Sequence, residues 1–129
     1  MGRGTILVVE DDPKLSFIIH AQLHSAGFDV VPRESGEGAL TTLETLTPDL
    51  VLLNIQLLPG IDGIEVCRRI RADRRLAHIP VIFLTVRADS ESRTQCLSAG
   101  ANDYVTKPWN ASDLILRISN SIALARSQR

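Results

Sequence analysis

Short apolar runs alternate with longer segments of helical period along the whole chain, and this alternation limits the possible folds more than any other feature. The apolar runs are rich in Val, Ile and Leu and have the length of buried strands. We expect strands over residues 5–10, 28–31, 49–54, 80–85 and 103–106, and helices over residues 13–26, 35–46, 62–73, 89–99 and 110–126. The predicted order is a strand followed by a helix, repeated five times, or (βα)5.

The predicted strands are apolar at nearly every position, which is typical of strands buried on both faces. Strands that alternate with helices form a parallel sheet through right-handed crossovers, so we expect a three-layer α/β sandwich. In such sheets the ligand site lies at the carboxyl ends of the strands. A length of 129 residues and 44% hydrophobic content fit one domain over residues 1–129. Whether it is the N-terminal part of a longer protein stays open.

The composition argues against several functional classes. The formal net charge of −1 provides no general attraction to nucleic acid or to an anionic membrane. Apolar runs such as residues 6–9 and 81–84 are far shorter than the roughly 18 residues that a membrane span needs. The first residues contain no apolar signal core. We therefore expect a cytoplasmic protein that contacts neither a membrane nor nucleic acid directly.

Polar residues that can carry chemistry stand where the predicted strands end. Glu10 and Asp11 follow the first strand, Asn54 ends the third, Thr85 ends the fourth, and Lys107 follows the fifth. Paired acids bind a hard divalent cation through oxygen, while a hydroxyl and an ammonium group can hold a phosphoryl group. This combination predicts a site that handles or senses phosphate.

Four segments resemble the landmark segments of the response-regulator receiver domains of two-component systems. They are ILVVEDDP, PDLVLLN, PVIFLT and GANDYVTKPW, and they follow one another in the family's order and at nearly its spacing across the chain. The resemblance implies a flavodoxin-like fold with a parallel five-stranded sheet of order 2-1-3-4-5. It also implies a signalling module rather than an enzyme, with a histidine kinase or other signalling protein and an output domain or protein as partners.

The resemblance assigns a role to each polar residue at the strand ends. In the family, two acids bind Mg²⁺, an aspartate accepts the phosphoryl group, a hydroxyl residue and a lysine contact that group, and an aromatic residue turns inward after the hydroxyl moves. By position these roles fall on Glu10 and Asp11 for the metal, Asn54 for the acceptor, Thr85 and Lys107 for the phosphoryl contacts, and Tyr104 for the aromatic switch.

This chain departs from the family pattern at three places in one pocket. Asn54 replaces the acceptor aspartate, and an amide cannot form an acyl phosphate. Pro59 follows the acceptor position by five residues instead of the usual four, and Val86 stands where the family has a small residue. The departures favour a pseudo-receiver that is not phosphorylated at Asn54 and acts through protein contacts. The alternative is a conventional Mg²⁺-dependent phosphoacceptor that carries an introduced aspartate-to-asparagine substitution at position 54.

Metal binding and self-association are expected to be weak. Glu10, Asp11 and the Asn54 side-chain oxygen could hold Mg²⁺ with one charge fewer than in the family, and the alternative is that Lys107 is the counter-ion of both acids. The working surface is expected over residues 89–99, 103–106 and 110–126. There Asp103 and Arg117 are kept, whereas Asn102 and Ser98 replace usual acids. We expect a monomer or a weak homodimer through this surface.

Two further groups of residues are expected to face water. His20 and His24 are four residues apart, but the apolar stripe Leu15, Ile19, Leu23 and Ala26 places them on the opposite side of their helix. An arginine run in and after the third predicted helix is also interpreted as a solvated face; it consists of Arg68, Arg69, Arg71, Arg74 and Arg75.

Overall fold

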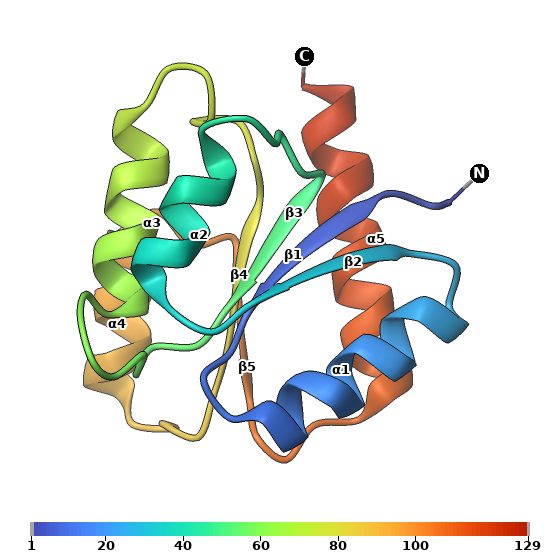
Figure 1. Ribbon diagram of the computed structural model, residues 1–129, viewed down its shortest axis with the longest axis horizontal. Coiled ribbons are helices and arrows are strands. Elements are labelled where there is room, and N and C mark those ends of the chain that lie inside the picture. Colours follow the sequence, from blue (N-terminus) through green and yellow to red (C-terminus); the bar gives the residue numbers. More distant parts are fainter. Residues whose placement is uncertain (1, 129) are drawn as a thin grey trace.

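A computed structural model describes residues 2–128 and confirms the predicted alternation of strands and helices. A parallel five-stranded sheet of order β2-β1-β3-β4-β5 lies between two layers of helices (Figure 1). The elements are β1 (Thr5–Val9), α1 (Pro13–Ser25), β2 (Asp29–Arg33), α2 (Gly36–Leu43), β3 (Leu50–Leu53), α3 (Gly63–Ala72), β4 (Val81–Thr85), α4 (Ser90–Ser98), β5 (Asp103–Thr106) and α5 (Ala111–Ser127).

The sheet is buried on both faces, as its continuous apolar strands predict. Alternate side chains of β1 point to opposite faces of the sheet. Leu7 and Val9 pack with α2, α3 and α4, whereas Ile6 and Val8 pack with α1 and α5. All four of these side chains are almost fully buried. Because all five strands are parallel, their carboxyl ends lie on the same side of the sheet.

Helix starts are marked by capping side chains. The Asp12 carboxylate accepts hydrogen bonds from the backbone N–H groups of Lys14 and Leu15, and Asp62 and Asp89 cap α3 and α4 in the same way. Such caps satisfy N–H groups that have no partner within the helix. These three acids lie near the strand ends, but they serve the helices rather than a ligand.

One strand is longer than predicted. The expected strand at 28–31 extends as β2 to Arg33, through Pro32. Proline has no backbone N–H, but β2 is an edge strand that pairs only with β1, so the missing donor costs no sheet hydrogen bond. Among residues 2–128 no helix is both long enough and apolar enough to cross a membrane.

Candidate functional site

The carboxyl ends of four neighbouring strands bring the predicted polar residues together. Asn54 N–H donates to the Val9 carbonyl at 3.1 Å, and Lys107 N–H donates to the Thr85 carbonyl at 2.8 Å, so the parallel pairing continues beyond the strands. Glu10, Asn54 and Thr85 are 3%, 9% and 1% exposed. The strand ends therefore bring these polar side chains together in a site that is largely buried.

A buried ion pair occupies this pocket. The Lys107 ammonium donates to Glu10 Oε1 at 2.6 Å, and both side chains are less than a tenth exposed. Glu10 Oε2 accepts hydrogen bonds from the Asp12 backbone N–H at 3.0 Å and from Asn54 Nδ2 at 3.4 Å. The alternative to metal binding made Lys107 the counter-ion of both Glu10 and Asp11; among the described residues its ion pair is with Glu10.

The protonation of Glu10 reflects opposing influences. Burial raises the pKa of the Glu10 carboxyl above its usual value, while Lys107 and the Asp12 N–H lower it again. The neighbouring Asp11 carboxyl adds a smaller rise. The negative charge of Glu10 in this dry site thus depends chiefly on Lys107.

The donor set gives a direct test of fit to Mg²⁺. Carboxylate and amide oxygens suit the ion chemically. However, both Glu10 oxygens already have partners, and Asn54 presents its amide nitrogen to Glu10. In the stretch from residue 2 to residue 128, no group of three or more His, Cys, Asp or Glu side chains could hold a metal ion. Asp11 and the Asn54 oxygen are the remaining oxygen donors of the predicted set.

The loop after Asn54 is fixed at both ends. Gly63 packs so closely that a Cβ there would lie 2.0 Å from the Asn54 carbonyl oxygen, and Gly63 N–H donates to the Ile55 carbonyl at 2.7 Å. Farther along, the Glu37 carboxylate accepts a hydrogen bond from Ile61 N–H at 2.9 Å. This backbone bond lowers the pKa of the exposed Glu37 carboxyl. The loop that carries the extra residue is therefore attached to α2.

Two large apolar side chains in the neighbouring loops point into water. Val86, next to Thr85, is 67% exposed, and Leu58, next to Pro59, is 72% exposed. Val86 was expected to crowd the phosphoryl position. Its exposure shows that it does not fill the pocket, so any obstruction lies at the entrance.

Thr85 and Tyr104 both bind the backbone of Arg87. The Thr85 hydroxyl accepts a hydrogen bond from Arg87 N–H at 3.3 Å, and the Tyr104 hydroxyl donates to the Arg87 carbonyl. Tyr104 is 5% exposed, and the Arg93 guanidinium lies 5.2 Å from the centre of its ring. The aromatic residue is thus held inward, between β4 and α4, by the chain's own groups.

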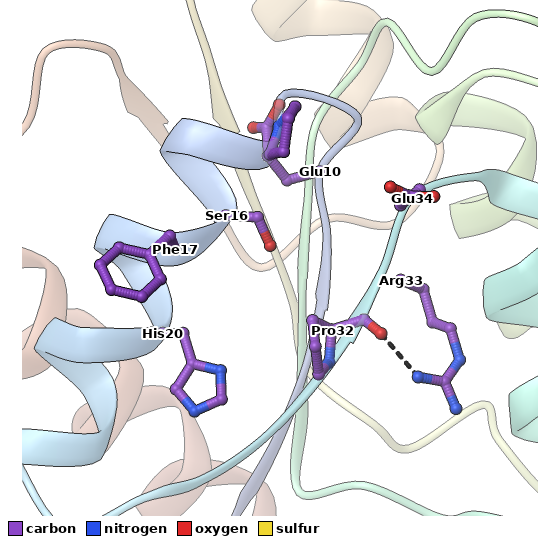
Figure 2. A pocket seen from close by; sticks show the side chains of 8 residues that line it. Glu10, Ser16, Phe17, His20, Pro32, Arg33 and Glu34 are labelled. Carbon is purple, nitrogen blue, oxygen red and sulfur yellow. Dashed lines mark hydrogen bonds between the residues drawn. The ribbon is translucent and has the colours of Figure 1, made fainter.

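A groove beside the polar pocket was not predicted from the sequence. It has a volume of about 330 Å³ and lies between α1 and the end of β2 (Figure 2). Its only sequence signal is Phe17, an aromatic residue outside the apolar stripe of α1, which is 75% exposed. His20 was expected to face water fully, but it is half-buried and lines this groove. The remaining lining residues are Glu10, Pro13, Ser16, Pro32, Arg33 and Glu34.

The predicted working surface combines ion pairs with exposed leucines. Arg117 forms ion pairs with Asp103 and Asp113, each at 2.9 Å. Leu97 of α4 and Leu124 of α5 are about half exposed. This surface is therefore partly apolar and only lightly charged.

The arginines of the run in and after α3 differ in their exposure to water. Arg68 and Arg69 are exposed and pair with Glu65, which agrees with a solvated face. For Arg71 the expectation was wrong, because its side chain is half-buried and bonds the backbone of two loops. The reason is its place at the end of α3, where the chain turns back toward β4.

The fold and the polar residues at its strand ends are those of an α/β module with a site at the carboxyl ends of its strands, and comparison with known proteins gives the family. Residues 6–119 match the family described as the response regulator receiver domain. The chain belongs to this family.

Relatives of known sequence extend well beyond this chain. It is 42% identical over 116 residues to the DNA-binding response regulator MtrA of Mycolicibacterium smegmatis, and it is 37% identical over 113 residues to the DNA-binding dual master transcriptional regulator RpaA of Synechocystis. These matches cover 90% and 88% of this chain but 49% and 46% of those proteins. The chain thus spans about half the length of the curated relatives it matches.

Solved structures agree with the family and the fold. The receiver domain of sensor histidine kinase PA1611 from Pseudomonas aeruginosa PAO1, which holds a magnesium ion in its active site cleft, is 35% identical with a TM-score of 0.86, over 93% of this chain and 98% of that chain. A CheY-like receiver domain protein from Methanospirillum hungatei JF-1 is 26% identical with a TM-score of 0.89, over 97% and 98%.

Proposed function

We propose that this chain is a pseudo-receiver, a signal-transduction module that is not phosphorylated at Asn54 and that acts through protein contacts. One observation carries the proposal: an amide stands at the acceptor position, directed at the Glu10 carboxylate. An amide is nearly non-nucleophilic and has no acyl phosphate product. A binding role, rather than catalysis, follows for the pocket.

The contacts inside the pocket support this proposal. The Lys107 ammonium, which in the family would contact a phosphoryl group, is already bonded to Glu10 at 2.6 Å. Mg²⁺ binding is accordingly proposed to be weak, with Asp11 and the Asn54 oxygen as ligands and with Glu10 shared with Lys107. When bound, the ion would neutralise acidic charge, and no phosphoryl transfer depends on it.

Tyr104 supports a fixed output state. In the family the matching aromatic residue turns inward after the hydroxyl residue moves toward the phosphoryl group. Here Tyr104 is held inward by the Arg87 carbonyl and by the Arg93 guanidinium. We therefore propose that the surface of α4, β5 and α5 has one prevailing arrangement that phosphorylation does not set.

Partners are proposed to bind that surface in the cytoplasm. A histidine kinase or another signalling protein would deliver the signal, and an output domain or protein would receive it. The lightly charged surface favours a monomer or a weak homodimer. Since the relatives are about twice as long, an output region in the same protein is compatible with this proposal.

A second candidate function rests on the residues that remain. Glu10, Asp11, Thr85 and Lys107 all occupy their family positions, so a single change at position 54 would restore the full set of residue types. This chain would then be a conventional Mg²⁺-dependent phosphoacceptor with an introduced asparagine. The parent gene sequence at codon 54 separates the two candidates.

The proposed function is tested by incubating the protein with Mg²⁺ and a small phosphodonor, followed by intact mass measurement. We expect no stable phosphoryl adduct, because position 54 lacks a carboxylate. A stoichiometric mass gain of one phosphoryl group that is lost at alkaline pH would overturn the proposal. Peptide mapping of any label then shows which residue carries it.

A further inference from the structure

The C-terminal ends of α3 and α5 lie on the side of the sheet opposite the polar strand ends (Figure 1). Arg71 is the penultimate residue of α3. Its Nε donates to the Gly100 carbonyl at 2.9 Å, and its Nη1 donates to the carbonyls of Ile79 at 2.6 Å and Ala77 at 3.3 Å. Its Nη2 donates to Asn102 Oδ1 at 2.7 Å. All four acceptors are neutral.

No carboxylate compensates this guanidinium. In the described part of the chain, residues 2–128, no Asp or Glu oxygen lies within 4.0 Å of Arg71. Burial lowers the pKa of Arg71, and only the Cys67 thiol acts in the opposite direction. A guanidinium nevertheless stays charged in proteins. A positive charge is therefore partly removed from water without a negative partner, which is unfavourable.

A hollow of about 350 Å³ opens beside this charge. This volume falls in the lower part of the range for small-molecule sites, about 300–1,000 Å³. The lining also offers the imidazole of His78 and the side-chain amide of Gln128 as polar groups, and among the described residues 2–128 no acid lines it. Of the five N–H groups of a guanidinium, the four hydrogen bonds leave one on Nη2. The hollow thus combines room, positive charge and donors.

We propose that this hollow binds a small oxyanion, a phosphate or carboxylate group, against Arg71. The remaining Nη2 N–H can donate one charge-assisted hydrogen bond to an oxygen of either group. The phosphate of a small metabolite and the carboxylate of a small acid share this chemistry. The site is separate from the strand-end pocket, so it is independent of whether Asn54 can be phosphorylated.

A substitution at Asn102 can test whether Arg71 binds an anion or only links loops of the chain. Its Oδ1 accepts hydrogen bonds from both Arg71 and the Val81 N–H at 2.8 Å. An Asn102→Asp substitution keeps an oxygen acceptor for both bonds and adds the missing negative charge. The new carboxylate would compensate Arg71 from within the chain and compete with an outside anion.

The test measures thermal unfolding and amide NMR spectra of the protein in sodium phosphate and in sodium acetate, against sodium chloride at equal ionic strength. We expect a saturable rise in Tm with at least one oxyanion, since a ligand that binds only the folded state stabilises it. Chemical shifts of Arg71 Nε–H, Ala77 and Gly100 should change along the same titration. A stronger response to phosphate than to acetate identifies a phosphoryl ligand, and the reverse identifies a carboxylate.

Variants locate the effect. Asn102→Asp should weaken oxyanion binding about tenfold or more, by charge competition at short range, and should raise Tm when chloride is the only anion. Asn120→Asp adds the same charge at an exposed position of α5 and should leave the oxyanion response unchanged. If Asn102→Asp does not fold, His78→Glu places a carboxylate at the mouth of the hollow from an exposed position and should weaken binding as well.

Two outcomes would overturn the proposal. One is an unfolding temperature and spectra that depend on ionic strength alone, with no difference between the oxyanions and chloride. The other is an oxyanion response that persists unchanged in both Asn102→Asp and His78→Glu. Either result would leave Arg71 as a structural link between the loops before β4 and β5.

Discussion

Lys107 and Arg71 are cations withdrawn from water at opposite edges of the same sheet, and they are compensated differently. Lys107 lies 2.6 Å from a carboxylate oxygen of Glu10, whereas Arg71 bonds only carbonyl and amide oxygens. At the family's site the positive charge is paired with a carboxylate of the chain, while at the far end of the sheet no carboxylate among residues 2–128 lies within 4.0 Å of Arg71. The two ends of the sheet therefore differ in whether the buried cation has a carboxylate partner, more than in how many hydrogen bonds it makes.

The largest expected effect comes from breaking the compensated pair. Lys107→Met should lower the free energy of unfolding by about 3–5 kcal/mol, because it leaves the Glu10 charge buried without a partner. Urea denaturation at neutral pH measures this loss. Lys14→Met removes an exposed lysine and should change stability by no more than about 0.5 kcal/mol.

A double variant sharpens the same test. Glu10→Gln combined with Lys107→Met removes both charges and should recover much of the lost stability, since a matched neutral pair avoids the unpaired charge. A single Lys107→Met variant as stable as the parent would show that the ion pair at the strand ends contributes nothing. The contrast with Arg71 would then lose its energetic basis.

The second prediction adds a negative charge at position 54, next to the Lys107–Glu10 pair. Asn54→Asp supplies a nucleophile, but we expect it to label with a small phosphodonor about 100-fold more slowly than a variant that also carries Val86→Ala and lacks Leu58. The reason is the altered loop and the larger side chain at the entrance. Labelling rates are measured by intact mass over time with Mg²⁺.

The opposite outcome at position 54 is also informative. Efficient labelling of Asn54→Asp alone would show that the surrounding pocket is intact. It would favour an introduced asparagine over natural degeneration, and it would agree with the exposed position of Val86.

A third prediction compares the buried pair with an exposed one. Arg117 is 42% exposed in its pair with Asp103, so its loss should cost only about 0–1 kcal/mol of stability. Arg117→Glu together with Leu97→Ala should nevertheless reduce partner binding, because both side chains are exposed on the surface of α4, β5 and α5. Pull-down of a cognate partner and a circular dichroism spectrum measure binding and fold.

The control for that surface lies on α1. Phe17→Ala removes the exposed aromatic residue of the groove in Figure 2 without touching α4, β5 or α5. If this change abolishes partner binding and the Arg117 and Leu97 changes leave it untouched, the functional surface is α1 and the assignment is wrong.

The smallest expected effect concerns the loop after Asn54, which is bonded to Glu37 of α2 through Ile61. The Ile61 N–H lowers the pKa of the Glu37 carboxyl from its ordinary value of 4.5, so the bond is present above that pH. As pH falls through the lowered pKa, the carboxyl is protonated and the stability that it contributes is lost. Hydrogen exchange of the Ile61 amide, corrected for the intrinsic pH dependence, should become faster below pH 4.5 in the parent. In Glu37→Gln the corrected exchange rate should not change with pH over the same range.

The overall fold was available from the sequence because it depends on local patterns. Five apolar runs and five helical segments are enough for a parallel sheet covered on both sides, and capping residues such as Asp12 and Asp62 mark the helix starts. The convergence of Glu10, Asn54, Thr85 and Lys107 also followed, because parallel strands end at one edge of the sheet. The end of β2 was predicted too early because Pro32 has no backbone N–H to donate to a neighbouring strand. Only the strand order shows that β2 is an edge strand, where a proline is tolerated.

Only the tertiary structure decided how charges are partnered. Sequence spacing placed Lys107 near two acids, but the choice of Glu10 depends on three-dimensional positions. Arg71 looked like its neighbours Arg68 and Arg69, yet it alone turns inward, because the loops that it bonds come from residues up to 31 positions away in the chain. Sequence patterns report which face of an element is apolar, whereas hydrogen bonding and burial of a long polar side chain depend on what other segments bring beside it.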